Sequence, residues 1–390
     1  MRILVLTFYF QPDLCAGSFR TTALVNALGQ QAAADDMIDV ITTLPNRYSS
    51  LNAFAPKEEV SKQVRIRRIA LPRHESGMID QSKAFLRFAA EAWKLTRGER
   101  YDLVFASSSR LFTAFLGACI ATRARTRYYA DIRDIFTDSI GDVLDRKSPF
   151  RALLPIFRTI ERFTIRRADV VNLVSEGFRD HFERIDPRKD YRLFTNGIDE
   201  EFLARSYEKP EEPGPIRILY AGNIGSGQGL DCIVPQAARL LGNNYEFIVI
   251  GDGGARKRLE AAIDTYGVPN VKLLRPVSRE ELMEWYAKAD ILFLHLNEHR
   301  AFQKVLPSKI FEYAATGKPV LAGVSGYAAE FLREHVPNSA VFEPCDAKGC
   351  IRGLQSLEMS ITPRTSFICR FRRETIMRLM AQDVLRAVAK

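Results

Sequence analysis

One stretch decides the fold: residues 216–230, IRILYAGNIGSGQGL. Its first six residues predict a strand, and a helical pattern starts at Leu230, so a turn with four glycines joins the two. Glycine lets backbone amides approach a phosphate closely, because it has no Cβ. The spacing is not the Gly-x-Gly-x-x-Gly fingerprint of dinucleotide-binding enzymes. The turn therefore indicates a phosphate site of another kind, with a flexible loop without a ligand as the alternative.

Strands and helices alternate on both sides of this stretch. Apolar, β-branched runs predict strands at 2–7, 39–43, 64–69, 103–106, 127–130, 170–174, 247–250, 271–274, 291–296, 320–322 and 340–342. Such alternation predicts an α/β protein with parallel sheets covered by helices. A segment with three prolines and no aliphatic residue, 207–215, interrupts it and reads as a linker.

We therefore predict two Rossmann-like, doubly wound domains that face one another across a cleft, and a terminal helix. Residues 1–205 form the first domain, 206–365 the second, and 366–390 the helix. The cleft is the expected ligand site.

Composition limits the class of protein. Of the 390 residues, 46% are hydrophobic and 26% charged, which is ordinary for a soluble globular protein with two cores. The longest apolar run, 111–121, is about half the roughly 20 residues of a spanning helix. The N-terminus lacks the features of a signal peptide, so a cytoplasmic location is expected. The six cysteines form no Cys-x-x-Cys pair, which predicts free thiols and no metal site.

The net charge of +9 is concentrated in basic stretches at 57–73 and 151–167. A basic face can meet nucleic acid, anionic lipid or only water. Nucleic-acid binding would require exposed aromatic residues among the cations or a known module, and neither is found.

Residues 306–320, LPSKIFEYAATGKPV, carry the clearest binding signal. Ser308 is a good N-cap after Pro307, so the helix that follows would offer free N–H groups and a positive dipole end to a phosphate. Glu312 follows one turn later, about 5.4 Å along the axis. This spacing suits a diphosphate on the helix tip and a ribose diol on the carboxylate, whereas the alternative is an ordinary capped helix with an exposed glutamate.

Three further segments follow predicted strands. Gly17 and Arg20 lie at the start of a helix. A cation there is unfavourable for the helix dipole, which indicates that Arg20 binds an anion, and the alternative is that Arg20 pairs with an aspartate. A charged cluster follows a buried strand, where α/β folds place their functional sites: Asp131, Arg133 and Asp134. The alternative is an internal ion-pair network. Gly251 opens a Gly-Asp-Gly-Gly turn that is either part of a donor site or a turn without a ligand.

Taken in order, these segments resemble glycosyltransferases of family 4 with the GT-B fold. More narrowly, the chain is similar to bacterial O-antigen and capsule enzymes such as the L-fucosamine transferases. The resemblance covers nearly the whole chain and rests on residues 13–20, 131–134, 196–199, 222–229 and 307–313.

The resemblance implies a retaining transfer from a nucleotide-sugar, with no cofactor and no metal. It departs from the family pattern where Asn223 and Gln228 replace an arginine and a lysine, where Lys304 replaces a glutamate, and where Arg133 replaces a histidine. Arg20, Lys304 and Lys309 could restore the lost positive charge. The donor-binding residues predicted are Gly17, Arg20, Gly222, Asn223, Gln228, Gly251, Leu306, Ser308, Lys309 and Glu312. The catalytic residues predicted are Asp131, Arg133, Asp134 and Lys304.

The resemblance also implies partners: a UDP-sugar donor, preferably an N-acetylamino sugar, and a polyprenyl-diphosphate-linked saccharide acceptor of lipopolysaccharide or capsule synthesis. Residues 150–167 combine five arginines with Phe150, Leu154, Phe157, Ile160 and Phe163. Such a helix can lie on an anionic membrane, which predicts a peripheral protein at the inner face. The alternatives are a nucleotide-sugar epimerase of the same fold and a non-catalytic nucleotide-sugar binder. A dehydrogenase is excluded by the glycine spacing.

Overall fold

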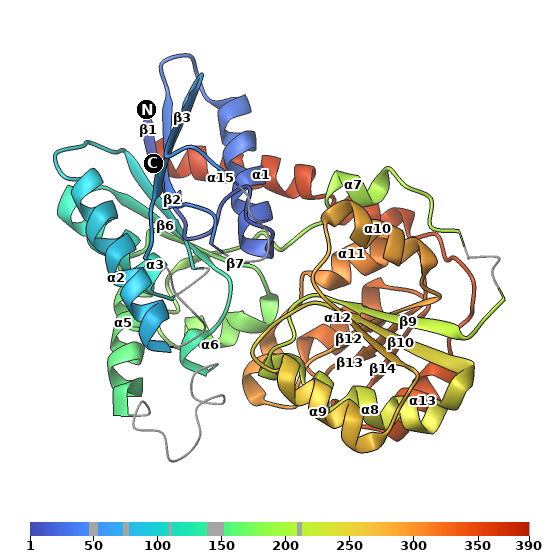
Figure 1. Ribbon diagram of the computed structural model, residues 1–390. Helices are drawn as coiled ribbons and strands as arrows, with labels where there is room; N and C mark the ends of the chain where they lie inside the picture. The colour runs from blue at the N-terminus through green and yellow to red at the C-terminus, as the bar shows by residue number, and fades with distance from the viewer. Residues whose placement is uncertain (47–53, 73–77, 109–110, 139–151, 209–212, 390) are drawn as a thin grey trace. The chain divides into compact units, whose positions relative to one another are not determined.

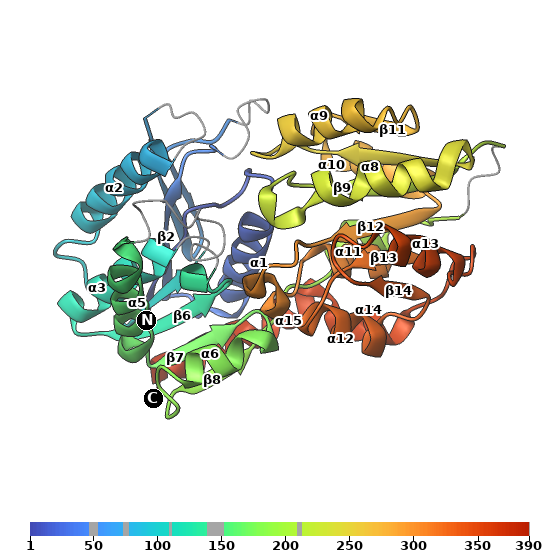
Figure 2. The same cartoon turned by 90° about the horizontal axis from the view of Figure 1, so that it is seen from below.

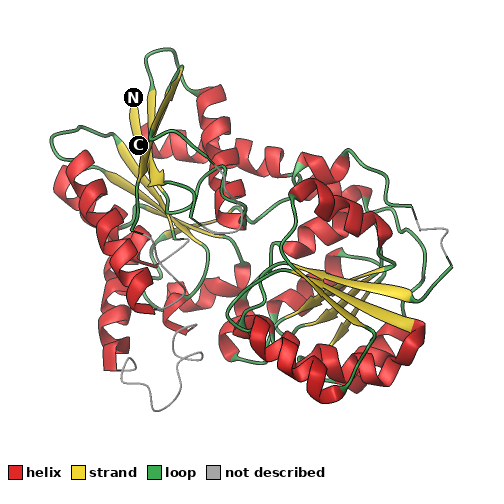
Figure 3. Ribbon diagram, viewed as in Figure 1, coloured by secondary structure: helices red, strands yellow, loops and turns green. Residues whose placement is uncertain are grey.

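The computed structural model describes residues 1–46, 54–72, 78–108, 111–138, 152–208 and 213–389. The chain forms two compact units, the first made of Met1–Asn196 with Arg373–Lys390 and the second of Gly197–Arg372. Each unit is a sheet with helices on both faces (Figure 1, Figure 2, Figure 3). The predicted architecture of two Rossmann-like α/β domains is confirmed.

The first unit has an eight-stranded sheet in the order β3-β4-β2-β1-β5-β6-β7-β8. All neighbours pair in parallel except β3 with β4. The strands are β1 (Arg2–Leu6), β2 (Met37–Thr43), β3 (Glu58–Ser61), β4 (Val64–Ile69), β5 (Leu103–Ser107), β6 (Arg127–Ile132), β7 (Val170–Leu173) and β8 (Asp190–Leu193). The predictions missed β3 and β8, since these edge strands bury none of their residues and so lack the apolar signal of an inner strand.

The helices of the first unit include one contributed by the end of the chain. They are α1 (Ala16–Gln31), α2 (Met78–Leu95), α3 (Leu111–Ala124), α5 (Leu154–Arg167), α6 (Arg179–Glu183) and α15 (Arg373–Ala389). Helix α15 packs along α1 and also reaches β6 (Figure 1). Asp383 of α15 accepts hydrogen bonds from the Tyr129 hydroxyl, at 3.0 Å, and from Arg192 Nε, at 3.1 Å.

The second unit has a fully parallel sheet in the order β11-β10-β9-β12-β13-β14. Its strands are β9 (Ile216–Ala221), β10 (Tyr245–Ile250), β11 (Val271–Leu274), β12 (Ile291–His295), β13 (Val320–Gly323) and β14 (Ser339–Phe342). Its helices are α7 (Glu200–Leu203), α8 (Leu230–Leu241), α9 (Arg256–Tyr266), α10 (Arg279–Lys288), α11 (Lys309–Ala315), α12 (Tyr327–His335), α13 (Ala347–Gln355) and α14 (Thr365–Phe371). The strand order reverses between β9 and β12, which is where such sheets bind ligands beyond their carboxyl ends.

The predicted terminal helix is in fact two helices. The backbone of Arg372 is non-helical, at φ −60° and ψ 122°, and separates α14 from α15. Phe367 and Phe371 of α14 pack on Phe311 in the second unit. Ile376, Met377, Met380 and Val384 of α15 are buried in the first unit, so the two halves of the segment serve different cores.

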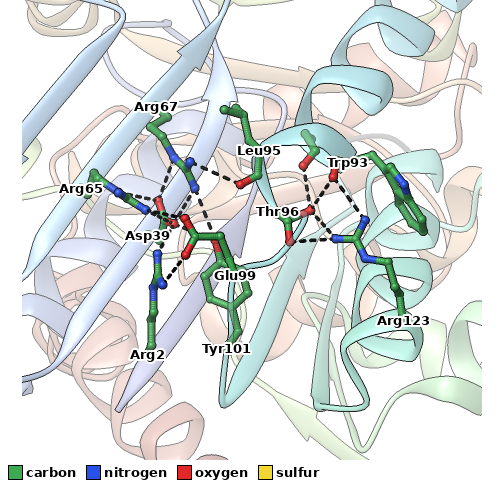
Figure 4. Close-up of polar contacts among 11 residues, drawn as sticks. Arg2, Asp39, Arg65, Arg67, Trp93, Leu95, Thr96, Glu99, Tyr101 and Arg123 are labelled. Atoms are coloured by element: carbon green, nitrogen blue, oxygen red, sulfur yellow. Dashed lines mark hydrogen bonds and ion pairs between the residues drawn. The ribbon is translucent and has the colours of Figure 1, made fainter.

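The basic stretch around β4 is largely neutralised inside the first unit (Figure 4). Asp39 of β2 is fully buried and accepts hydrogen bonds from Arg65 Nη2, at 2.8 Å, Arg67 Nη2, at 2.6 Å, and the Tyr101 hydroxyl, at 2.7 Å. Burial by itself would raise the pKa of Asp39, but these hydrogen bonds and the arginine charges lower it. Two arginines predicted from sequence to form part of a basic face therefore hold the sheet together.

Candidate functional site

The glycine turn after β9 lies directly against the loop after β10. The Gly222 amide donates to Ile250 O at 2.8 Å, and the Ile224 amide donates to Asp252 O at 2.9 Å. A Cβ at Gly251, whose φ is +153°, would overlap the carbonyl oxygen of Gly222. Glycine at 251 is therefore required for the two loops to touch, and the structure brings together the two glycine segments that the sequence singled out separately.

Asn223 and Gln228, which replace two cations of the family pattern, brace the turn. Asn223 Nδ2 donates to Gln228 Oε1 at 2.9 Å, and the Gly225 amide donates to the same oxygen at 3.1 Å. The carbonyl of Asn223 accepts from the Tyr220 hydroxyl at 2.6 Å. These neutral side chains hold the shape of the turn without supplying charge.

Lys309 supplies positive charge over this turn. Its Nζ donates to the Tyr220 hydroxyl at 3.3 Å and lies 4.7 Å from the centre of that ring. A Cβ at Gly222 would overlap Nζ, so the ammonium group stands directly over the first glycine. Lys304, at the end of the 3₁₀ helix Arg300–Lys304, is partly buried.

Two predictions for the segment before α11 need correction. Ser308 occupies the N-cap position, but its backbone is already helical, at φ −61° and ψ −26°, and its side chain makes no capping hydrogen bond. The amide of Ile310 donates to Pro307 O and that of Phe311 to Ser308 O, so the first turn already uses part of its N–H groups. Leu306 is 3% exposed, so its side chain belongs to the core, and its predicted contact with the donor is left to its backbone.

Glu312 lies on α11 one turn after Ser308, as predicted, and is partly exposed. Its Oε2 accepts a hydrogen bond from the hydroxyl of Tyr286, at 3.2 Å. Tyr286 belongs to α10 and is fully buried. Sequence reasoning missed Tyr286 because nothing in its neighbourhood on the chain distinguishes it from an ordinary core aromatic residue.

Sequence reasoning also missed His295, the last residue of β12. Its Nδ1 lies 2.6 Å from Gln228 O, and its Nε2 accepts the Cys345 amide at 2.9 Å. Burial lowers the pKa of this imidazole to about 4, so it is neutral at pH 7. His295 thereby links the end of β12 to the glycine turn.

Arg20 and Asp131 are buried against one another in the first unit, each 1% exposed. Arg20 Nη2 lies 2.9 Å from Asp131 Oδ1, and the guanidinium also donates to the carbonyls of Phe194 and Thr195. Asp131 further accepts from Ser107, at 3.0 Å, and from Asn172, at 2.8 Å. The internal ion pair given as the alternative is thus the arrangement found, and it replaces the donor-binding role of Arg20 and the catalytic role of Asp131. Because α1 begins at Ala16, Gly17 is a buried residue of its first turn.

Asp134 has a different environment from Asp131. It lines a small cavity with Ser108, Glu161 and Phe182, and its Oδ1 has no hydrogen-bond partner within the described parts of the chain. Burial, with the nearby charge of Glu161, raises the pKa of Asp134 to about 6 against the opposing effect of Arg133. The Arg133 amide donates to Ser108 Oγ at 2.9 Å. Asp134 thus lies outside the ion pair of Arg20 and Asp131, and its catalytic role, like that of Arg133, stays a prediction.

The sequence did not reveal the role of Glu161, which is the one acidic residue of a basic helix. Both of its oxygens accept from the Thr137 hydroxyl, at 3.2 and 3.0 Å. His181 Nε2 lies 2.9 Å from Glu161 Oε2. The carboxylate is buried on the inner face of α5, where it borders the same cavity as Asp134.

The outer faces of α2 and α5 expose large apolar side chains. Leu86 is 67% exposed, Trp93 40%, Ile156 54% and Phe163 40%. Phe157, predicted to face a membrane, instead packs inward on Phe112 and Phe136, whereas Phe150 lies outside the described residues. Among the described helices, none has the length and apolar character needed to span a bilayer.

Comparisons with known proteins agree with this architecture. Residues 202–368 match the family of glycosyl transferases group 1, and residues 20–197 match the glycosyl transferase 4-like domain. The putative colanic acid biosynthesis glycosyl transferase WcaI of Escherichia coli (strain K12) is 24% identical over 98% of this chain and 100% of its own length.

Two solved structures share the fold over nearly their full length. Anabaena Alr3699/HepE in complex with UDP superposes with a TM-score of 0.64 at 17% identity, covering 98% of this chain and 99% of that one. The lipopolysaccharide outer core galactosyltransferase WaaB, in its apo form, has a TM-score of 0.65 at 11% identity and covers 99% of both chains.

Proposed function

The chain is a family 4 glycosyltransferase of the GT-B fold, and on this basis we propose that it transfers a sugar, with retention, from a UDP-sugar to a lipid-linked saccharide in bacterial surface polysaccharide synthesis. The observation that carries the proposal is the position of Lys309 Nζ over Gly222, with Glu312 one turn further along α11. Two relatives support the class of substrate, since WcaI is named for colanic acid biosynthesis and HepE was solved with UDP.

The chemistry of this site follows from the charge on the leaving group. As the bond between the anomeric carbon and the diphosphate breaks, the diphosphate keeps the electron pair and gains negative charge, which fixed dipoles and cations must stabilise. We assign this task to the amides of the glycine turn, to Lys309 and to Lys304. Glu312 accepts hydrogen bonds from the ribose diol. These groups would make a divalent metal unnecessary.

The acceptor belongs to the first unit in this proposal. The oxygen of an acceptor hydroxyl bonds to the anomeric carbon and its proton passes to a phosphate oxygen of the leaving group. Asp134, with its unpartnered oxygen at the cavity, would orient that hydroxyl, and Arg133 would assist. The acceptor we propose is a saccharide on polyprenyl diphosphate, and the donor sugar an N-acetylamino sugar, as in the L-fucosamine transferases that the sequence resembles.

The same proposal places the protein on the inner face of the membrane. Exposed Trp93 and Leu86 lie seven residues apart on α2, and Ile156 and Phe163 lie seven apart on α5, so each pair shares one helical face. Exposed cations accompany both pairs, as on helices that lie at an anionic lipid surface.

Isothermal calorimetry with UDP and GDP, with and without EDTA, tests the donor site. We expect micromolar UDP binding that survives EDTA and weakens at least about tenfold in Glu312→Ala and in Lys309→Ala. Lys348→Ala, which removes an exposed lysine of α13, is the matched control and should bind as the wild type does. Binding of neither nucleotide by the folded protein would overturn the donor site. Loss of binding in EDTA would overturn the metal-free mechanism.

A product assay then separates the donor sugars. UDP-linked N-acetylamino sugars and GDP-mannose would be offered with a polyprenyl-diphosphate-linked saccharide. Transfer from GDP-mannose alone would refute the proposed donor class. Conversion of the donor without any acceptor would favour an epimerase instead.

A further inference from the structure

Tyr286 packs against two other aromatic rings in the second unit. The ring of Phe202 stacks on it at 5.8 Å with an interplanar angle of 26°, and that of Tyr313 meets it edge-on at 5.6 Å and 84°. The side chain is fully buried. Because the ring is buried and packs on two other rings, the packing of the core sets the position of the hydroxyl.

Phe202, which stacks on Tyr286, is itself held in place by Arg279. Arg279, in the first turn of α10, donates to Asp199 Oδ2 at 2.6 Å and also pairs with Glu201. Its guanidinium lies 5.1 Å from the ring centre of Phe202. The segment that carries Phe202 is thus tied to the helix that carries Tyr286.

The Tyr286 hydroxyl points at Glu312, the carboxylate assigned above to the ribose. The donor–acceptor distance to Oε2 is 3.2 Å. Burial, and then the charge of Glu312, raises the pKa of Tyr286 well above its ordinary value, so the phenol keeps its proton and acts as a donor. The last torsion of a glutamate side chain has a broad minimum, and a hydrogen bond to Oε2 limits the rotation of the carboxylate about it.

We propose that Tyr286 is a positioning residue for donor binding: its hydroxyl holds one oxygen of Glu312 so that the other oxygen accepts from both ribose hydroxyls of the nucleotide. The inference rests on the proposed function, because it takes a UDP-sugar as the donor and Glu312 as its ribose contact. Tyr286 itself touches no substrate. Its effect on binding passes entirely through the carboxylate.

The test compares two nucleotides that differ only in the ribose diol. Calorimetry measures the dissociation constants of UDP and 2′,3′-dideoxy-UDP with the wild type and with Tyr286→Phe. The phenylalanine keeps an aromatic ring against Phe202 and Tyr313 and removes only the hydroxyl. We expect UDP to bind about tenfold more weakly to the variant, whereas the affinity for dideoxy-UDP changes by less than about twofold.

Tyr313→Phe is the matched control. It removes a buried hydroxyl from the same aromatic group, and that hydroxyl accepts the Ala221 amide at 3.4 Å. Any effect of losing a core hydroxyl near the turn should weaken both nucleotides equally, so the ratio of their affinities stays at the wild-type value. Thermal unfolding of each variant verifies that it is folded.

The outcomes separate this inference from the function beneath it. If the wild type binds UDP more tightly than dideoxy-UDP but Tyr286→Phe keeps that preference, or loses both affinities equally, the positioning role is overturned while the donor site stands. If the wild type does not distinguish the two nucleotides, Glu312 does not read the diol and the inference is overturned. If the wild type binds neither, the proposed function itself is overturned.

Discussion

Lowering the pH from 7 to 5 should destabilise the second unit through one residue, His295. Its imidazole is fully buried, with Nδ1 at 2.6 Å from Gln228 O and Nε2 accepting the Cys345 amide at 2.9 Å. Both nitrogens are engaged in the neutral form, with Nδ1 as the donor. A second proton on Nε2 would face the Cys345 N–H and break that hydrogen bond.

The size of the effect follows from the pKa. Burial lowers the pKa of His295 from 6.5 to about 4. Because the folded value is lower, the unfolded chain binds the proton first as the pH falls. The stability from keeping His295 neutral is complete above about pH 6.5 and is lost as the pH falls towards 4. At about 1.36 kcal/mol per pKa unit the full loss is about 3 kcal/mol, of which about 2 kcal/mol is lost between pH 7 and pH 5.

Urea unfolding at pH 7 and pH 5 measures this loss in the second unit alone. The chain has two tryptophans, so a Trp93→Phe background leaves Trp285 of α10 as the only fluorescent reporter. His295→Gln in that background is the matched control, because glutamine does not titrate. The control should be less stable at pH 7, by about 1–3 kcal/mol for the lost hydrogen bonds. Between pH 7 and pH 5 it should lose about 2 kcal/mol less than its parent.

The comparison cancels the other titrating groups, which both proteins share. Equal losses in parent and control would refute the reasoning, since the pH dependence would then come from groups other than His295. A parent that lost less than the control would reverse the sign of the argument and show a raised histidine pKa.

Three further predictions concern the glycine loop and the two carboxylates of the first unit. Gly251→Ala should abolish UDP binding and lower the free energy of unfolding in urea by at least about 2 kcal/mol, because the new methyl group would overlap a backbone oxygen. In Gly254→Ala the new methyl group meets no atom within 4 Å, so this control should change neither measurement. Arg20→Met should destabilise the first unit by about 3–5 kcal/mol in unfolding monitored by Trp93 fluorescence, because the buried carboxylate of Asp131 loses its cation. The side chain of Arg188 is 94% exposed, and a loss no larger than that of Arg188→Met would contradict the buried ion pair. Asp134→Asn should lower transfer activity yet stabilise the first unit by about 3 kcal/mol at pH 8. The pKa of Asp134 is about 6 in the folded protein and 3.8 in the unfolded chain, so ionisation of this carboxyl costs stability as the pH rises. A gain of the same size at pH 4 would contradict this.

Much of the second unit could be derived from local sequence. The strands at Ile216–Ala221 and Val271–Leu274 have the predicted bounds, because a strand buried on both faces must be a short apolar run that ends at a turn. The glycine turn and Glu312 were also predicted from local sequence. A backbone that must approach another backbone closely requires glycine, and helical spacing places Glu312 relative to Ser308.

Local sequence could not decide which charges are free. Arg20 and Asp131 lie 111 positions apart and form one buried pair, whereas Asp134, three residues after Asp131, has an oxygen without a partner in the described structure. Nothing in the order of residues distinguishes the two aspartates. Partner choice depends on which strand and helix ends meet in space, and this is a property of the packed sheet.

The sequence by itself determined the fold class and the glycine turn, because both depend on periodicity or on backbone demands that only certain residues meet. The enzyme class was predicted from the resemblance to family 4 glycosyltransferases. Only the tertiary structure decided that Lys309 stands over the turn, that Tyr286 donates a hydrogen bond to Glu312 and that His295 contacts the carbonyl of Gln228. Each of these contacts joins segments far apart in the chain, or elements whose faces become neighbours only when the sheet is assembled. A hydrogen bond or an ion pair requires separations correct to a few tenths of an ångström, and packing alone sets distances to that accuracy.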